Sequence, residues 1–292
     1  HGFFKNAQKD AGDFASDPKI AGVSEPGLTA LVAAALVKNG IPADDTVVAK
    51  AMKFLESKVQ KDGGIESRMS NYMTCLAIMT FKEANVGDKY KKTIEDATKF
   101  VKGLQFADGL KETDPNYGGA GYGAPGPKSR PDMSNTHFMM EALLAGGVSK
   151  DDPSIKRALV YISRSQNLAD DEFNNLPYAK KATAADKGGF VYNLSDADND
   201  KSPKRTAEGG LRSEGGMTYA GLKSFLYAGV AKDDKRVKAA IEWVRKNYSV
   251  TENPGQKDAG LFCYYHTFAK AMDALGEDPF TDAKGVKHDW RK

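Results

Sequence analysis

The sequence predicts an all-α protein, an α/α toroid of five to six helical hairpins with an inner and an outer ring of helices. Three observations lead to this prediction. A helical motif centred on threonine recurs along the chain, two kinds of helix alternate, and glycine-containing turns join them. Self-similarity of this kind is the signature of stacked units that bury their apolar faces against one another.

The recurring motif is clearest at 254–276, PGQKDAGLFCYYHTFAKAMDALG, where glycines precede an aromatic helix that closes at a glycine. The same pattern occurs in PGLTALVAAALVKNG, NYMTCLAIMTFKEANVG, SNTHFMMEALLAGG and GGMTYAGLKSFLYAG. Alignment of these copies superposes Thr29, Thr74, Thr136, Thr218 and Thr267. The steps between the threonines are unequal, so the repeat contains insertions.

Amphipathic helices alternate with these apolar ones, and they are predicted over 46–60, 91–105, 154–166 and 235–248. Each has apolar residues at helical spacing with lysine or arginine between them. A helix with a charged face is exposed to water, whereas a helix that is apolar on most sides is surrounded by protein. The amphipathic helices are therefore expected in the outer ring and the apolar helices in the inner ring.

The ends of the chain carry further signals. The first apolar helix is predicted over 24–38, with Ser24 as a candidate N-cap and Pro26 in the first turn. Before it, residues 8–12 are typical of a helix that ends in a turn. At the other end, 281–292 predicts the start of another outer helix.

We interpret residues 1–292 as one toroid domain with two long insertions, at 106–131 and 167–213. Long loops inside a compact domain are usually functional or disordered. The chain starts at His1 without a signal-peptide pattern, which suggests a processed protein or an excised fragment and favours an exported, periplasmic or extracellular, location.

Composition excludes several classes of protein. The net charge of +3 comes from 42 basic and 39 acidic residues scattered over the predicted helices, so no nucleic-acid partner is expected. Two cysteines exclude a disulfide scaffold. No apolar run approaches the roughly 20 residues needed to span a bilayer, so the protein is not expected to be transmembrane.

The turn at 60–65, QKDGGI, resembles the repeat of squalene-hopene cyclases, oxidosqualene cyclases and protein prenyltransferase β subunits, which is often Q-x-x-G-x-W. Ile65 stands in place of the tryptophan, and Phe190 and Leu261 are similar replacements in later turns. The sequence looks closest to bacterial prenyltransferase/squalene-oxidase-repeat or squalene-cyclase-like proteins. The resemblance implies the toroid and a central cavity that binds an isoprenoid or another apolar small molecule.

In such a toroid the N-terminal ends of the inner helices face the cavity, and the candidate site residues cluster at these ends. Arg130 and Arg212 could hold a diphosphate or a carboxylate bidentately. The candidate substrate-binding residues are Arg130, Asn135, His137, Arg212, Glu214, Tyr219, Tyr72 and Tyr264. The candidate catalytic residues are His266, Asp132 and Tyr265, although Asp132 also suits a helix cap.

No cofactor is predicted, with zinc and calcium as the alternatives. Tyr265-His266-Thr267 resembles the prenyltransferase stretch whose histidine binds zinc, but the matching helix, GGMTYAG, lacks the Asp and Cys ligands. His266 then serves as a general acid or base or as a hydrogen-bonded histidine. The run at 196–200 suits a surface loop, a calcium-binding loop, or a variant of the D-x-D-D acid of terpene cyclases.

Three functional hypotheses remain open, and the sequence does not decide whether the chain is an enzyme. The first is a squalene-cyclase or prenyltransferase-like protein that binds an isoprenoid. The second is a non-catalytic toroid module of a larger exported protein that binds a protein partner or a glycan. The third is a polysaccharide lyase-like enzyme in which Tyr265 or His266 is the base and arginines neutralise a uronate.

Overall fold

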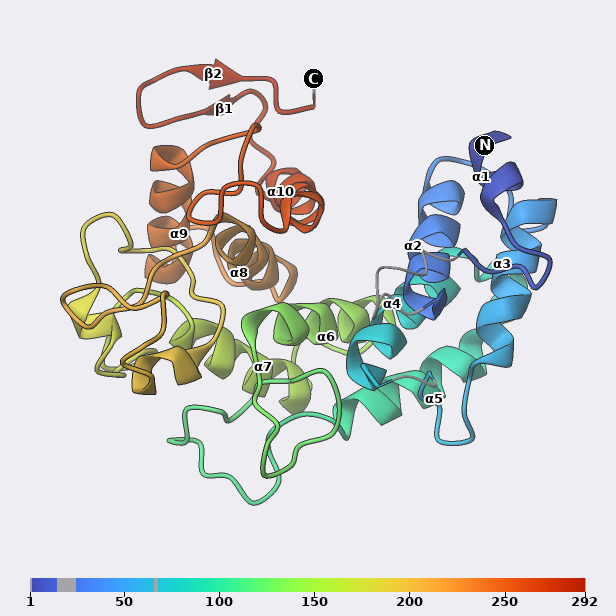
Figure 1. Cartoon of the computed structure of the whole chain (residues 1–292), viewed down its shortest axis with the longest axis horizontal. Helices are drawn as coiled ribbons and strands as arrows, with labels where there is room; N and C mark the ends of the chain where they lie inside the picture. Colours follow the sequence, from blue (N-terminus) through green and yellow to red (C-terminus); the bar gives the residue numbers. More distant parts are fainter. Residues whose placement is uncertain (1, 15–24, 66–67, 292) are drawn as a thin grey trace. The chain divides into compact units, whose positions relative to one another are not determined.

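The computed structural model describes residues 2–14, 25–65 and 68–291 (Figure 1). This part of the chain contains ten α-helices and one two-stranded sheet, so the predicted all-α fold is confirmed. The helices are α1 (Gly2–Ala7), α2 (Glu25–Lys38), α3 (Thr46–Ser57), α4 (Ser70–Glu83), α5 (Lys91–Lys102), α6 (Met133–Ala145), α7 (Pro153–Arg164), α8 (Gly215–Tyr227), α9 (Lys235–Lys246) and α10 (Leu261–Leu275). None of these helices combines the length and apolar character needed to cross a membrane.

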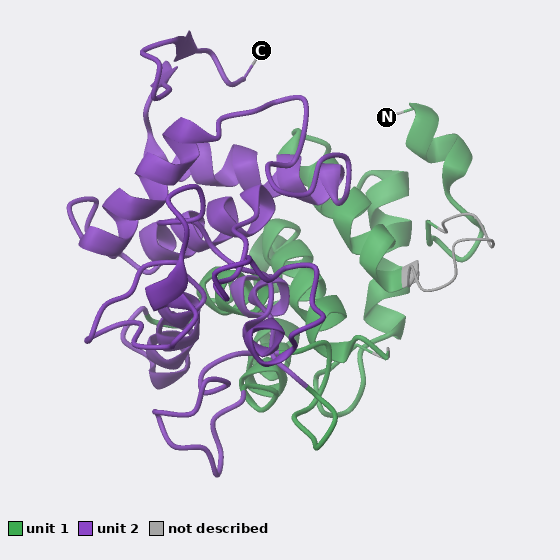
Figure 2. Ribbon diagram, turned by 60° about the vertical axis from the view of Figure 1, so that its left-hand side comes forward, with its two compact units in different colours: residues 1–105, 121–129, 138–149 green, residues 106–120, 130–137, 150–292 purple. Residues whose placement is uncertain are grey.

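The chain divides into two compact units (Figure 2). Unit 1 comprises residues 1–105, 121–129 and 138–149, and unit 2 comprises 106–120, 130–137 and 150–292. Within unit 1, α2 packs against α3 and α4, and α4 packs against α5. Within unit 2, α8 packs against α7, α9 and α10. Each unit is therefore a set of neighbouring helices whose shared faces form its core.

The extent of burial differs clearly between the apolar helix α8 and the amphipathic helix α9. In α8, ten of thirteen residues are buried, whereas α9 buries four of twelve. Helices α3, α7 and α9 begin at aspartates whose carboxylates accept a backbone N–H from the first turn. Local sequence thus determines where each amphipathic helix starts, and its apolar stripe determines which face it buries.

Four of the five aligned threonines hold the turn that precedes their helix. Each hydroxyl accepts a hydrogen bond of 2.9–3.0 Å from the backbone N–H at the end of that turn. The pairs are Phe14 with Thr29, Ile65 with Thr74, Ala120 with Thr136, and Phe190 with Thr218. The fifth hydroxyl, of Thr267, bonds to carbonyls of its own helix instead. The threonine alignment therefore reflects a repeated contact between turn and helix.

The same turns place a glycine against the backbone of the next outer helix. Gly118 has a φ of +86°, and a Cβ there would lie 1.8 Å from the carbonyl oxygen of Arg157 on α7. Gly12, Gly63 and Gly188 make equivalent approaches to α3, α5 and α9. A side chain is excluded at these positions both by the backbone conformation and by the space.

An equivalent backbone hydrogen bond closes each of these turns, whether the turn is short or long. The N–H groups of Lys9, Gln60, Phe106 and Asn167 bond to the carbonyls of Asp13, Gly64, Gly119 and Gly189, respectively. Gln166, one residue before this position, donates to the carbonyls of Gly188 and Arg236, as Gln8 does to Gly12 and Val47. Gln60 lies one residue later than Gln8 and Gln166 in this pattern, and its exposed side chain donates to the carbonyl of Lys58.

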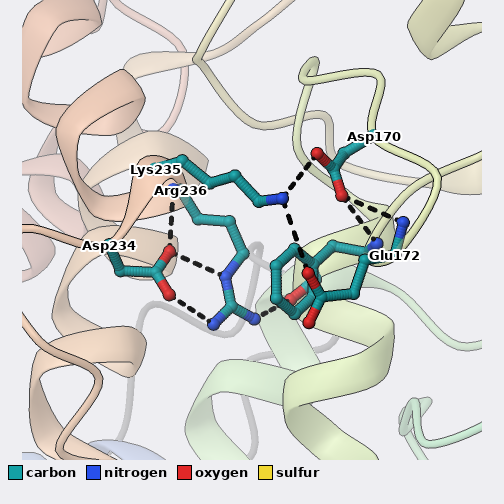
Figure 3. A network of polar contacts seen from close by, with 7 residues as sticks. Asp170, Glu172, Asp234, Lys235 and Arg236 are labelled. Atoms are coloured by element: carbon teal, nitrogen blue, oxygen red, sulfur yellow. Dashed lines mark hydrogen bonds and ion pairs between the residues drawn. The ribbon is translucent and has the colours of Figure 1, made fainter.

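The predicted insertions enter the chain inside these turns. No α-helix lies in 106–131 or 167–213, and the second insertion contains two short 3₁₀ helices, η2 (Ala179–Lys181) and η3 (Leu194–Asp198). Figure 3 shows how this insertion is attached to α9. The ammonium of Lys235 lies 2.7 Å from the carboxylate of Asp170, and the guanidinium of Arg236 lies 3.7 Å from the ring centre of Phe173.

The prediction that 281–292 begins an outer helix is wrong. The segment forms a hairpin of β1 (Phe280–Thr281) and β2 (Lys287–His288). The carboxylate of Asp282 accepts the backbone N–H groups of Lys284 and Val286, and this satisfies donors that a helix would otherwise use. Gly285, with a φ of +81°, completes the turn.

At the N-terminus, α1 ends at Ala7 and the N–H of Gly12 bonds to the carbonyl of Lys9, as the predicted helix-to-turn transition requires. Helix α2 covers the predicted 24–38 except for its first residue. The candidate N-cap, Ser24, lies outside the described residues.

Candidate functional site

The first turn of α6 brings two predicted site residues together. Asp132 caps the helix, because its carboxylate accepts the backbone N–H and the side-chain Nδ2 of Asn135, each at 2.8 Å. Burial raises the pKa of Asp132, and these hydrogen bonds only partly offset the effect. The Oδ1 atom of Asn135 is buried without a hydrogen-bond partner among the described residues. The site therefore contains one structural carboxylate and one unused acceptor.

A buried pair of basic side chains joins α6 to α8. Nζ of Lys223 lies 3.3 Å from Nδ1 of His137, and the two residues are 0% and 1% exposed. When Lys223 is protonated its ammonium can only donate, so this contact then requires Nδ1 as the acceptor and the imidazole proton on Nε2. His137 was a predicted site residue, whereas Lys223 was not. The available signal was that Lys223 is the one charged residue in the sequence of α8.

The N-terminal end of α8 carries a second buried charge. Glu214 lies at the N-cap position, is 6% exposed and forms an ion pair with Lys204. Burial raises the pKa of Glu214, and Lys204 opposes that rise. The two predicted anion-binding arginines, Arg130 and Arg212, are both exposed.

The N-terminal end of α10 presents aromatic side chains on both of its faces. Tyr264 is buried, with its ring centre 5.6 Å from that of Tyr219 and its hydroxyl donating to the carbonyl of Ser249 at 2.6 Å. Tyr265 is 36% exposed, and its hydroxyl donates to the carbonyl of Val250 at 2.9 Å. Phe262 is 88% exposed. One face of α10 therefore belongs to the core, and the other offers aromatic surface.

A family model, the squalene-hopene cyclase C-terminal domain, matches residues 13–183. The chain belongs to this family. None of the curated proteins compared with the chain matches it. The match covers α2 to α7, and membership agrees with the toroid fold class that the repeat predicts. It also confirms the resemblance to squalene cyclases and prenyltransferases on which the sequence interpretation relied.

Several site residues of this squalene-hopene cyclase C-terminal domain protein lie outside the matched range, on α8 and α10. Burial raises the pKa of Tyr219, and the neighbouring Tyr264 raises it further. Burial also raises the pKa of Tyr264. Both phenols are therefore protonated at neutral pH. His266 is partly buried on α10, and Tyr72 packs edge-on against Phe138 in unit 1 with ring centres 4.9 Å apart.

The acidic run at 196–200 lies in the second insertion. Asp196 accepts a hydrogen bond from the hydroxyl of Ser202, and Asp200 is paired with Arg205 at 3.2 Å while its side chain is 92% exposed. Throughout the described parts of the chain, no group of three or more His, Cys, Asp or Glu side chains lies close enough to hold a metal ion.

Proposed function

We propose that the chain binds an isoprenoid or another apolar ligand, and that the exposed aromatic face of α10 contacts it. The observation that carries this proposal is the 88% exposure of Phe262, beside the partly exposed Tyr265. Burying an aromatic side chain of this size contributes about 1.5–3 kcal/mol. A ligand that covers Phe262 therefore gains much of its affinity from this residue. Membership of a cyclase family supports an isoprenoid as the ligand class.

The positions along α10 support a single contact surface. Phe262, Tyr265, His266 and Ala269 follow the spacing of one helix face, and none of the four is fully buried. The hydrogen bond from Tyr265 to Val250 fixes the ring so that its face can meet a ligand. His266 provides a polar group one turn from Phe262, where it can contact the head of an isoprenoid alcohol or diphosphate.

The second candidate is binding of a protein partner by the same face, because an exposed aromatic residue also suits a protein interface. The lyase hypothesis has weaker support. A base must be able to accept a proton from the substrate, and the hydroxyl of Tyr265 already donates to Val250.

The test is saturable binding of farnesol, measured by calorimetry on the wild-type chain, Phe262→Ser and Phe3→Ser. Phe3 is the matched control, since it is 77% exposed on α1. We expect Phe262→Ser to weaken farnesol binding at least about tenfold and Phe3→Ser to leave it unchanged. Absence of binding by the wild-type chain, or equal losses in both variants, would contradict the proposal.

A further inference from the structure

A small pocket lined mainly by the second insertion, with Pro115 from the first, combines apolar walls with two cations. Its volume is about 210 Å³, and none of its lining residues lies on α6, α8 or α10. Leu176, Tyr178, Leu194 and Ala197 form much of the apolar wall and pack with a cluster of buried side chains. Pockets for drug-sized ligands are about 300–1,000 Å³. This pocket therefore suits a smaller molecule.

Two cationic side chains meet at Gly209 beside this pocket. A Cβ at Gly209 would lie 3.4 Å from Nζ of Lys181 and 3.4 Å from Nη2 of Arg205. Both nitrogens therefore flank Gly209, which has no side chain to stand between them. The φ of +82° at this residue also favours glycine.

The two cations differ in how they are held. Nη1 of Arg205 donates to the carbonyl of Ala197 and is 3.2 Å from the exposed carboxylate of Asp200, while Nη2 lies beside Gly209. The ammonium of Lys181 makes no ion pair or hydrogen bond with any residue that the structure describes. Asp198 also lines the pocket, but its side chain is exposed and solvent screens it.

We propose that this pocket binds a small amphipathic anion, a carboxylate or phosphate monoester on a short aliphatic chain. The chain lies against Leu176, Leu194 and Ala197, and the anionic head lies between Lys181 and Arg205. Charge-assisted hydrogen bonds to an anion are about twice as strong as neutral ones, and Lys181 has all three of its N–H groups available. The site uses other residues than the proposed isoprenoid surface, so each proposal can fail without the other.

The experiment titrates the full chain with hexyl phosphate and with hexanoate by calorimetry. Inorganic phosphate supplies the head alone, and hexanol supplies the chain alone. We expect at least one of the two anions to bind saturably. Inorganic phosphate and hexanol should each bind at least about tenfold more weakly than that anion. Inorganic phosphate that binds as tightly as hexyl phosphate would reveal an adventitious ion only. Hexanol that binds as tightly would reveal an apolar site without anion selectivity. Either result overturns the proposal, as does the absence of binding by both anions.

Two variants locate the site. Lys181→Gln removes the uncompensated cation and is expected to weaken binding at least about tenfold. Lys180→Gln is its control, because this exposed neighbour does not line the pocket. Ala197→Leu fills the apolar end and is expected to abolish binding of the aliphatic anion without unfolding the chain, which circular dichroism checks. Unchanged affinity in Lys181→Gln or in folded Ala197→Leu overturns the proposal.

Discussion

Nζ of Lys223 lies 3.3 Å from Nδ1 of His137, in a place that water does not reach. Taking an ammonium out of water costs several kcal/mol, so the charge must be held by what surrounds it. This pair links α8 to the first turn of α6. It is also the contact in unit 2 that the sequence pattern concealed most completely.

Replacing one member of this pair is expected to cost more than replacing both. His137→Phe removes the acceptor beside a buried ammonium and should lower the free energy of unfolding by about 3 kcal/mol, and Lys223→Met should lower it by about 2 kcal/mol. The double variant should lose less than the sum of the two, because it removes the charge together with its acceptor. Urea denaturation of the four proteins measures this cycle, and strict additivity would argue against a direct coupling.

Gly118 should tolerate alanine far less well than Gly109, although both lie in the first insertion with positive φ. Alanine at Gly109 meets no atom within 4 Å and pays only the backbone cost of about 1–2 kcal/mol. Alanine at Gly118 also meets the carbonyl oxygen of Arg157 at 1.8 Å, which adds about 1–3 kcal/mol or more. Thermal unfolding of both variants provides the comparison. Equal losses of stability in the two variants would mean that the close approach of Gly118 to α7 does not affect the stability of the fold.

The pH dependence of stability should report on the network in Figure 3. The hydrogen bond from Arg236 lowers the pKa of the Asp234 carboxylate, which also caps α9. A lowered folded-state pKa stabilises the fold above the unfolded value of about 3.9, and this stability is lost as pH falls through the folded value. Asp234→Asn keeps the cap but loses the charge. The wild-type chain should therefore be about 1 kcal/mol more stable near pH 6, with the advantage shrinking below about pH 4. A constant difference from pH 6 to pH 2 would contradict this account.

The two cysteines should differ sharply in reactivity. Cys263 is exposed beside Phe262, whereas Cys75 is buried in unit 1. Burial raises the pKa of the Cys75 thiol, with a smaller contribution from the charge of Glu141. Because the thiolate is the reactive species, one thiol per chain should react with a disulfide reagent under native conditions and two in urea. Loss of the fast thiol in Cys263→Ser identifies it, and a fast reaction of Cys75 would show that unit 1 opens readily.

Helix positions were predictable because they depend on local periodicity. The spacing of apolar residues defined α2, α3, α5, α7 and α9 to within a few residues, and the threonine alignment located turns whose hydrogen bonds repeat. The terminal segment was misinterpreted because its hairpin depends on the Asp282 side chain and on Gly285, not on a periodic stripe.

The candidate site was less predictable because its contacts join residues far apart in sequence. Lys223 and His137 are separated by 86 positions, and nothing in the pattern of α8 indicates which helix its lysine faces. Lys181 and Arg205 meet through an insertion that has no periodicity. By contrast, Asp132 could be assigned as a cap from its position alone, since a cap is a local interaction.

The backbone hydrogen bond that closes each turn marks a position in each hairpin where a loop can be grafted. The N–H of Gln60 pairs with Gly64 across three residues, whereas Asn167 makes the same pair with Gly189 around a long segment that contributes residues to a pocket. Closing a loop twice as long costs only about 0.6 kcal/mol more. A binding loop transplanted between Gln60 and Gly64 would thus start from a base that already supports long insertions elsewhere in this chain.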